Sequence, residues 1–151
     1  MKKASSAIAT NRTARFHYEI LEEFEAGMIL TGIQAKSLQT VKPKIAGSFV
    51  GINSKDEAWL RGLEIPIYKY AKGQAHDPKQ PIKLLLKEKE IATIKKALHE
   101  KGVTVVLINL HLKNHKIKVR IGLARGKKKW DKREALKKRD VERDVRRSLK
   151  Y

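Results

Sequence analysis

The sequence predicts an α+β fold that is mainly β, a small barrel with short helices followed by a basic C-terminal tail. Three observations lead to this prediction. Five or six short runs of apolar or alternating residues are typical of strands. Only two segments before the tail have the composition of helices. With 151 residues, the chain is long enough to bury one hydrophobic core but scarcely two.

The first part of the chain is predicted to contain an arm, a strand and a helix. Residues 1–10 include two lysines but no apolar stretch long enough for a secretion signal, and we expect them to form a flexible arm. Residues 15–31 alternate in places and predict one strand, or a bent pair of strands, broken at Gly27. Residues 32–38 are rich in helix formers and predict a short helix that ends before Pro43.

The middle of the chain is predicted to form a hairpin, a loop and the main helix. Residues 48–52 and 57–63 predict a β-hairpin, because the segment between them has the composition of a turn. Residues 71–81 hold two prolines and no large apolar side chain, which predicts an exposed loop. The main helix is expected over residues 84–98, with Gly102 as its stop. Its apolar residues recur at intervals of three, four and seven: Leu84, Leu85, Ile91, Ile94 and Leu98.

Two further strands, residues 103–112 and 116–123, are expected to flank a turn at residues 113–115. In the second of them basic residues alternate with apolar ones, so one face is apolar and the other basic. Together these elements predict a barrel of the OB kind over residues 11–124, followed by a tail over residues 125–151.

The charge of the chain indicates the class of its partner. Lys and Arg number 35 against 16 Asp and Glu, a net charge of +19. Such an excess repels itself in a compact fold, and it indicates a polyanionic partner, either nucleic acid or an anionic membrane surface. It disfavours a metabolic enzyme for small neutral substrates. No apolar run approaches the ~20 residues that span a bilayer, and the absence of cysteine is compatible with a reducing cytoplasm.

Basic residues form a stripe at the end of the predicted barrel. Lys116, Lys118 and Arg120 share one strand face and lead into the basic run 125–129. Any one of these lysines is well explained as a solvated surface residue, but a stripe of them is suited to track a phosphate backbone. Trp130 follows the stripe directly, where an indole is able to stack on a base or on an arginine plane.

The tail has a composition that does not support a fold of its own. Residues 125–151 contain 13 Lys or Arg and 5 Asp or Glu, which gives +8 of the total charge. We expect this tail to be disordered when the protein is free and to become helical only in an anionic environment. A solvated helical face is the alternative interpretation, favoured by the pair Glu134 and Lys138 at a spacing of four.

Catalytic and metal sites are not expected. His111 and His115 have a spacing of four, but they lie across a strand and a turn, where that spacing does not bring them together. His76 and Asp77 could in principle add to a metal site or serve as the acid and base of a nuclease, but no cluster of carboxylates accompanies them. We therefore expect no metal site and no cofactor, and the residues give no convincing catalytic constellation.

Several short motifs together resemble the SsrA-binding protein family, also called small protein B. They are residues 11–15, 25–32, 36–38, 83–86 and 126–134, which occur in the family's order and span most of residues 9–151. The resemblance implies an OB-fold barrel that binds the tRNA-like part of transfer-messenger RNA. It also implies delivery of that RNA to bacterial ribosomes stalled on mRNA without a stop codon, and thus a cytoplasmic adaptor, which we expect to be a monomer and not an enzyme.

The resemblance and the basic stripe together give a set of candidate site residues. The predicted RNA-binding residues of the barrel are Asn11, Arg12, Arg15, Tyr18, Glu25, Lys36, Lys83, Leu85, Lys118 and Arg120. The residues predicted to act near the decoding centre, against ribosomal RNA and in the mRNA channel, are Lys127, Lys128, Lys129, Trp130, Asp131, Lys132 and Arg133. Because phosphate repels a carboxylate, Glu25 is expected to accept hydrogen bonds from base amino or ribose hydroxyl groups, or to orient a neighbouring arginine.

The chain departs from the family pattern at three places. Gln34 stands where the family usually has Glu, Lys44 and Gly47 replace the usual Asn and Asp, and Trp130 takes a position often held by His or Tyr. Two rival functions remain open from the sequence. One is a ribosomal or general single-strand-binding OB protein, and the more distant one is a basic RNA-processing enzyme.

Overall fold

A computed structural model describes residues 6–70 and 76–127 of the chain. Its elements in order are β1 (Ser6–Thr10), α1 (Ala14–His17), β2 (Tyr18–Met28), α2 (Gly32–Thr40), β3 (Phe49–Ile52), β4 (Ala58–Arg61), β5 (Ile82–Leu85), α3 (Glu88–Leu98), β6 (Val103–Lys113) and β7 (Lys116–Gly126).

The long hairpin of β6 and β7 forms the centre of the fold. The two strands pair antiparallel from Val103 with Arg125 to Lys113 with Lys116. Asn114 and His115 form the turn with φ of 52° and 64°. Positive φ at both positions is typical of the tight hairpin turns whose twist matches that of the strands. The prediction of two strands around a turn at this place is confirmed.

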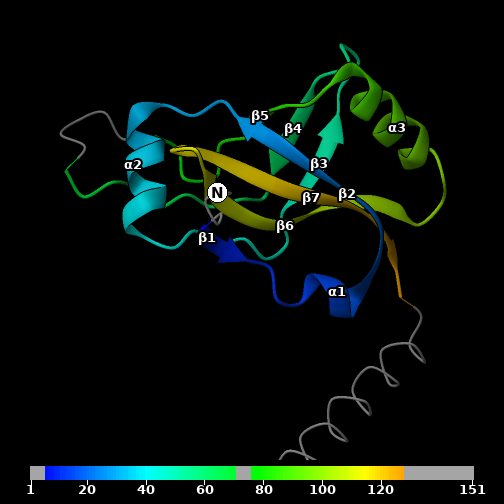
Figure 1. Cartoon of the computed structure of the whole chain (residues 1–151), viewed down its shortest axis with the longest axis horizontal. Helices are drawn as coiled ribbons and strands as arrows, with labels where there is room; N and C mark the ends of the chain where they lie inside the picture. Colours follow the sequence, from blue (N-terminus) through cyan, green and yellow to red (C-terminus); the bar gives the residue numbers. More distant parts are fainter. Residues whose placement is uncertain (1–5, 71–75, 128–151) are drawn as a thin grey trace, which may run out of the picture.

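Strand pairing closes the sheet into a ring. Seven strands in the described part of the chain have the order β1-β6-β3-β4-β5-β2-β7, and β7 pairs again with β6. Six strands therefore form a closed barrel, in which every pairing is antiparallel. Figure 1 shows β2 and β7 crossing the barrel, with α2 beside one end and α3 beside the other. The mainly β prediction is confirmed.

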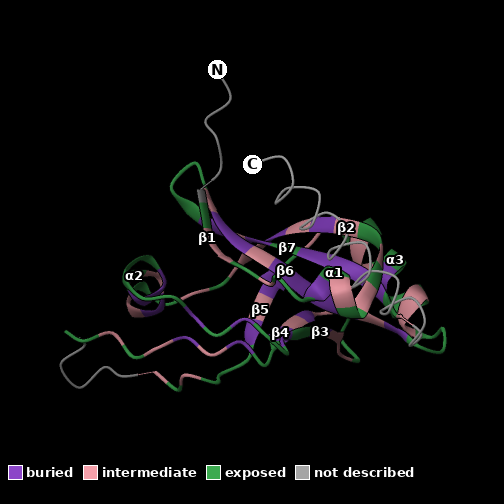
Figure 2. Ribbon diagram, turned by 90° about the horizontal axis from the view of Figure 1, so that it is seen from below, coloured by how far each residue is buried: buried purple, intermediate pink, exposed green. Residues whose placement is uncertain are grey.

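The core fills this barrel with aliphatic side chains. Leu60, Leu107, Val119 and Ile121 are completely buried, and Ile94 from α3 is buried with them at one end of the barrel. In β7 the apolar side chains point inward while the alternate basic ones remain at the surface, as predicted. Figure 2 shows the buried residues running along β6 and β7.

The short helix and the first hairpin also agree with prediction. Helix α2 ends at Thr40, before Pro43, and β3 pairs with β4 as a hairpin. At the start of α2 the backbone N–H of Gln34 donates to Thr31 Oγ1 at 3.2 Å, while the N–H of Thr31 donates to Gln34 Oε1 at 3.0 Å. This capping box is complete with Gln in place of the family's usual Glu.

The structure corrects the prediction of a flexible arm for residues 6–10, while residues 1–5 lie outside the described residues. Residues 6–10 form β1, which pairs with the segment of β6 from Asn109 to Leu112. Strand β3 pairs with β6 at Val106, so the far part of this long strand has a free edge that β1 covers. The pattern of small residues in this segment gave no sign of the pairing, because the edge comes from a strand about a hundred residues away.

Three other boundaries differ from prediction. Leu84 and Leu85 belong to strand β5, and the helix begins only at Glu88, so the prediction of a helix from residue 84 is wrong. The strand predicted over residues 15–31 begins only at Tyr18, because the residues before it form α1, and it continues through Gly27 to Met28 without a break. Strand β7 continues to Gly126, where it pairs with Tyr18, so the barrel ends beyond the predicted boundary at residue 124. Residues 76–81 form neither helix nor strand, as expected of a loop.

Candidate nucleic-acid interface

A set of alternating charges covers one outer face of the barrel, across β2, β7 and the end of β6. Two carboxylates in β2, Glu23 and Glu25, lie two residues apart and therefore point to the same side of the sheet. Basic side chains from other elements surround them. We call this set the cationic face; it consists of Arg15, Lys113, Lys118 and Arg120 around Glu23 and Glu25.

Glu23 lies between two arginines. The guanidinium of Arg15, from α1, donates to Glu23 Oε1, and Arg120 Nη1, from β7, donates to Glu23 Oε2 at 3.2 Å. The hydrogen bond from Arg15 outweighs the effect of burial and, with Arg120, holds the pKa of Glu23 below its ordinary value. Glu23 is therefore ionised at neutral pH.

Glu25 has a similar position between two lysines. Its Oε1 atom lies 3.2 Å from Lys113 Nζ and 3.5 Å from Lys118 Nζ. Burial acts to raise the pKa of Glu25, but the hydrogen bond from Lys113 and the surrounding positive charges together lower it. The sequence predicted that Glu25 could orient an arginine, and in the structure its ion-pair partners are lysines.

His111 lies beneath this face with a side chain that is 6% exposed. Its Nδ1 atom is 2.9 Å from Asn109 Oδ1, and its Nε2 atom is 3.5 Å from Glu25 Oε2. Burial lowers the pKa of His111 and outweighs the opposite effect of Glu25. The imidazole is thus neutral at neutral pH, and its contact with Glu25 becomes an ion pair only when the ring is protonated.

An apolar hollow adjoins the cationic face. Leu85 projects from β5 next to Gly27 of β2, and its side chain is largely exposed. The hollow is lined by Gly27, Met28, Leu30, Ala35, Gln39, Leu85, His115, Lys116, Ile117 and Lys118. Lys118 belongs to both the hollow and the cationic face, so the two form one continuous surface.

The structure brings only some of the predicted residues together. Arg15, Glu25, Lys118 and Arg120 belong to the cationic face, and Leu85 lies in the adjoining hollow. Lys83 instead forms an ion pair with Glu57 at 2.7 Å.

The other predicted barrel residues have mainly local positions. The side-chain amide of Asn11 donates to the Leu107 carbonyl at 3.2 Å, which ties the β1–α1 connection to β6. Arg12 is exposed in that connection, and Lys36 is exposed on α2. Tyr18 is half-buried at the start of β2.

The predicted tail site lies mostly beyond the described residues. Lys127 is described, and its backbone N–H donates to the His17 carbonyl at 3.0 Å, which extends the β2–β7 pairing by one residue. Lys128, Lys129, Trp130, Asp131, Lys132 and Arg133 lie outside the residues that the structure describes.

Sequence reasoning missed three members of the surface, Glu23, Lys113 and His111. Glu23 could have been found from its position two residues before Glu25 in the same strand, because residues two apart in a strand lie on the same face. The sequence places Lys113 in a turn, and it gives His111 the interpretations of a metal ligand or of a solvated or base-stacking side chain. Their grouping with Glu25 depends on the β6–β7 and β2–β7 pairings, which short-range patterns do not give.

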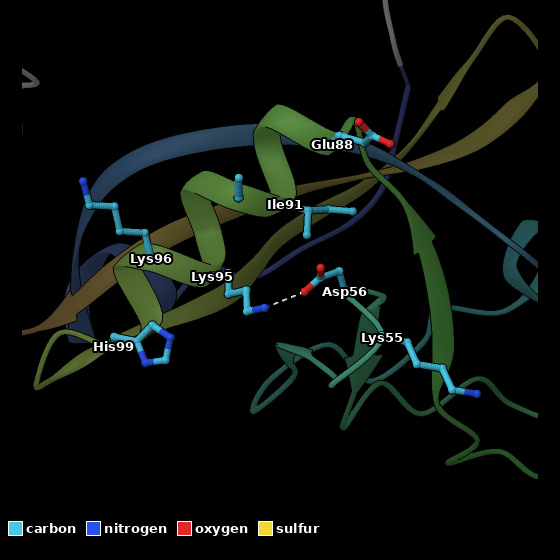
Figure 3. A pocket seen from close by; sticks show the side chains of 8 residues that line it. Lys55, Asp56, Glu88, Ile91, Lys95, Lys96 and His99 are labelled. Atoms are coloured by element: carbon cyan, nitrogen blue, oxygen red, sulfur yellow. Dashed lines mark hydrogen bonds and ion pairs between the residues drawn. The ribbon is translucent and has the colours of Figure 1, made fainter.

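A second hollow lies between α3 and the turn that joins β3 to β4. Lys95 Nζ reaches Asp56 Oδ1 at 2.7 Å across it (Figure 3). Lys55, Lys96 and Glu88 also line it, so acids and bases are nearly balanced there. This surface is less suited to a polyanion than the cationic face.

Within residues 6–70 and 76–127 no group of three His, Cys, Asp or Glu side chains could hold a metal ion. The helices in these same ranges are all too short or too polar to cross a membrane.

Comparisons with a family model and with known proteins indicate the same family. The model described as SmpB protein matches residues 8–151. The SsrA-binding protein of Oleidesulfovibrio alaskensis is 44% identical over 151 residues, covering 98% of this chain and 97% of that protein. The SsrA-binding protein of a Sulfurihydrogenibium species is 44% identical over 147 residues, covering 97% and 96%.

A solved structure supports the same assignment. It is described as "tmRNA-SmpB: a journey to the center of the bacterial ribosome", and its chain is 36% identical to this one with a TM-score of 0.67. The match covers 85% of this chain and 93% of that chain. The chain therefore belongs to the SmpB family, the SsrA-binding proteins.

Proposed function

We propose that this protein binds the tRNA-like part of transfer-messenger RNA and delivers it to bacterial ribosomes stalled on mRNA that lacks a stop codon. Membership of the SmpB family over residues 8–151 carries this proposal. The net charge of +19 supports it, because a structured RNA is the kind of polyanion that such a charge attracts. In this function the protein is a cytoplasmic adaptor that works as a monomer and catalyses no reaction.

The barrel, which we assign to the OB-fold, is the part that grips the RNA. Its cationic face would bind phosphate groups, and the hollow around Leu85 would receive the apolar face of a base or ribose. The family membership carries the OB assignment, and the small antiparallel barrel is compatible with it, with one strand more than the usual five. The exposure of Arg15, which is 64%, and of Lys113, which is 49%, supports a surface that is open to a ligand.

The tail would act on the ribosome. We infer that residues 130–151 are disordered in the free protein and become helical from about Asp131 onward in the empty mRNA channel, where ribosomal RNA neutralises their charge. Lys127, Lys128, Lys129, Trp130, Asp131, Lys132 and Arg133 would act near the decoding centre, with the indole of Trp130 stacked on a base. Residues 125–151 contain 13 Lys or Arg against 5 Asp or Glu, which supports this role.

The test is a comparison of two RNAs with the full-length protein. One is the tRNA-like part of transfer-messenger RNA, and the other is an unstructured RNA of equal length, both measured over a range of salt concentrations. We expect a clear preference for the folded RNA at every salt concentration. Equal affinity for both would favour a general single-strand-binding protein, and cleavage or modification of either RNA would favour an enzyme.

A further inference from the structure

The two carboxylates of the cationic face are less exposed to solvent than the basic side chains around them. The side chains of Glu23 and Glu25 are 28% and 27% exposed, whereas the four basic side chains are 34% to 64% exposed. A nucleic acid that approaches this face therefore meets the basic groups first. The carboxylates are therefore placed to form ion pairs with these basic groups within the protein.

Each carboxylate joins cations that come from different elements. Glu23 joins Arg15 of α1 to Arg120 of β7, and each arginine takes one of its two oxygen atoms. Glu25 joins Lys113 at the end of β6 to Lys118 of β7 through one oxygen, while its other oxygen faces His111. Without these acids, the long basic side chains would repel one another and move freely in solvent.

We propose that Glu23 and Glu25 are positioning residues, which hold Arg15, Arg120, Lys113 and Lys118 in a fixed array that selects a folded RNA over a flexible one. This inference rests on the proposed function, since it explains how the same surface distinguishes between two RNAs. Phosphates in a folded RNA are themselves held at fixed spacings, so a fixed array of cations is complementary to them. A flexible strand adapts to any arrangement and gains little from a fixed one.

The proposal differs sharply from an account based on total charge. The change Glu23→Gln removes one negative charge and raises the net charge from +19 to +20. If charge alone determined binding, this variant would bind every RNA more tightly. If Glu23 positions the two arginines, the variant binds the flexible RNA more tightly but the folded RNA more weakly.

The experiment measures the affinity of full-length Glu23→Gln and Glu25→Gln for the same two RNAs at several salt concentrations. Glu88→Gln, on α3 and away from the cationic face, is the control with the same change in charge. The quantity compared is the affinity for the folded RNA divided by the affinity for the flexible RNA. We expect this ratio to fall about tenfold in each test variant, equivalent to about 1.4 kcal/mol. The control is expected to keep the ratio of the parent protein. Glu23→Asp, which keeps the charge on a shorter side chain, should recover part of the ratio.

Three results would decide against positioning. If both RNAs bind more tightly by the same factor, as in Glu88→Gln, the acids act only through net charge. If both bind more weakly by the same factor, the acids support the surface as a whole without selecting between RNAs. If Glu23→Asp keeps the full ratio of the unsubstituted protein, the negative charge is sufficient and the reach of the side chain to the two arginines plays no part. A parent protein without any preference for folded RNA would instead overturn the proposed function, which separates the two failures.

Discussion

Leu85 of β5 lies against Gly27 of β2, close enough that a Cβ atom added to Gly27 would stand 3.5 Å from the Leu85 Cβ atom. The leucine side chain is 56% exposed, although its neighbour Leu84 is 2% exposed. Alternation along a strand explains this difference, since consecutive side chains point to opposite faces. The apolar surface of Leu85 is therefore open to a ligand, while the core depends on Leu84.

Leu85→Ala should separate RNA binding from stability. Because the side chain is exposed, we expect the free energy of unfolding to change by less than about 0.5 kcal/mol. The affinity for the tRNA-like RNA should fall by about fivefold to tenfold, equivalent to roughly 1 kcal/mol of lost apolar contact. Urea unfolding and equilibrium RNA binding on the same variant check both expectations.

Leu84→Ala provides the matched control for that experiment. Removal of a buried leucine side chain typically costs about 2–5 kcal/mol, so this variant should be strongly destabilised. Any of it that remains folded should bind RNA with nearly the parent affinity. If Leu85→Ala were the more destabilised of the two, its exposure in the structure would be wrong.

Gly122→Ala tests the contact of β7 with the strands on either side. An added Cβ atom would lie 2.9 Å from Ile108 Cδ1 and 3.0 Å from Ile20 Cγ2, both closer than normal contact. We expect a loss of about 1–3 kcal/mol in the free energy of unfolding from this overpacking. Ile108→Val removes one of the two close atoms and should restore part of the loss. Gly51→Ala, where nothing lies within 4 Å, is the control and should be nearly neutral.

The stability of the protein should fall as the solution is made acidic, in two stages. The pKa of His111 is lower in the folded protein than its ordinary value, so the unfolded chain binds more protons below about pH 6.5. The free energy of unfolding therefore falls as the pH drops through that range. The lowered pKa values of Glu23 and Glu25 add a second loss below about pH 4.5.

Urea unfolding from about pH 7.5 down to about pH 2.5 measures both stages of this profile. In His111→Gln the first stage should disappear while the second remains, whatever the variant's stability at neutral pH. A first stage of unchanged size in this variant would show that another group causes it.

The tail variants test the division of labour between barrel and tail. Trp130→Ala, and reversal of charge at Lys132 and Arg133, should leave the affinity for the tRNA-like RNA nearly unchanged. The same variants should abolish peptide transfer or tagging on stalled ribosomes, because the tail would no longer fit the mRNA channel. Binding and rescue activity are measured on the same protein samples. A proportional fall in both would mean that the tail is only an additional RNA grip.

The sequence predicted elements whose signals are local. The β6–β7 hairpin and α2 were found because alternation, turn composition and helix formers all lie within the segments themselves. The start of α3 was misplaced because Leu84 happens to stand seven residues before Ile91, which is a helical spacing, and Leu85 follows it directly. Those two leucines belong to a strand whose partners, β4 and β2, are distant in sequence.

Non-local pairing also explains what was missed at the candidate site. Strand β1 forms because the far part of β6 has a free edge, which no feature of residues 6–10 reveals. Glu25 was identified through the family resemblance, but its partners Lys113 and His111 come from β6, more than eighty residues later. A charge stripe can be read from one strand, whereas a cluster of opposite charges depends on which strands lie beside it.

The central claim is that the cationic face, and not the total charge, binds the tRNA-like RNA. Two full-length variants of equal net charge test it most directly. Lys118→Gln with Arg120→Gln changes the cationic face, and Lys89→Gln with Lys96→Gln changes exposed residues of α3; each pair lowers the net charge from +19 to +17. The measurement is the dissociation constant for the tRNA-like RNA at one salt concentration. We predict that the first pair weakens binding about tenfold more than the second, a difference of about 1.4 kcal/mol. Equal weakening by the two pairs would contradict the claim.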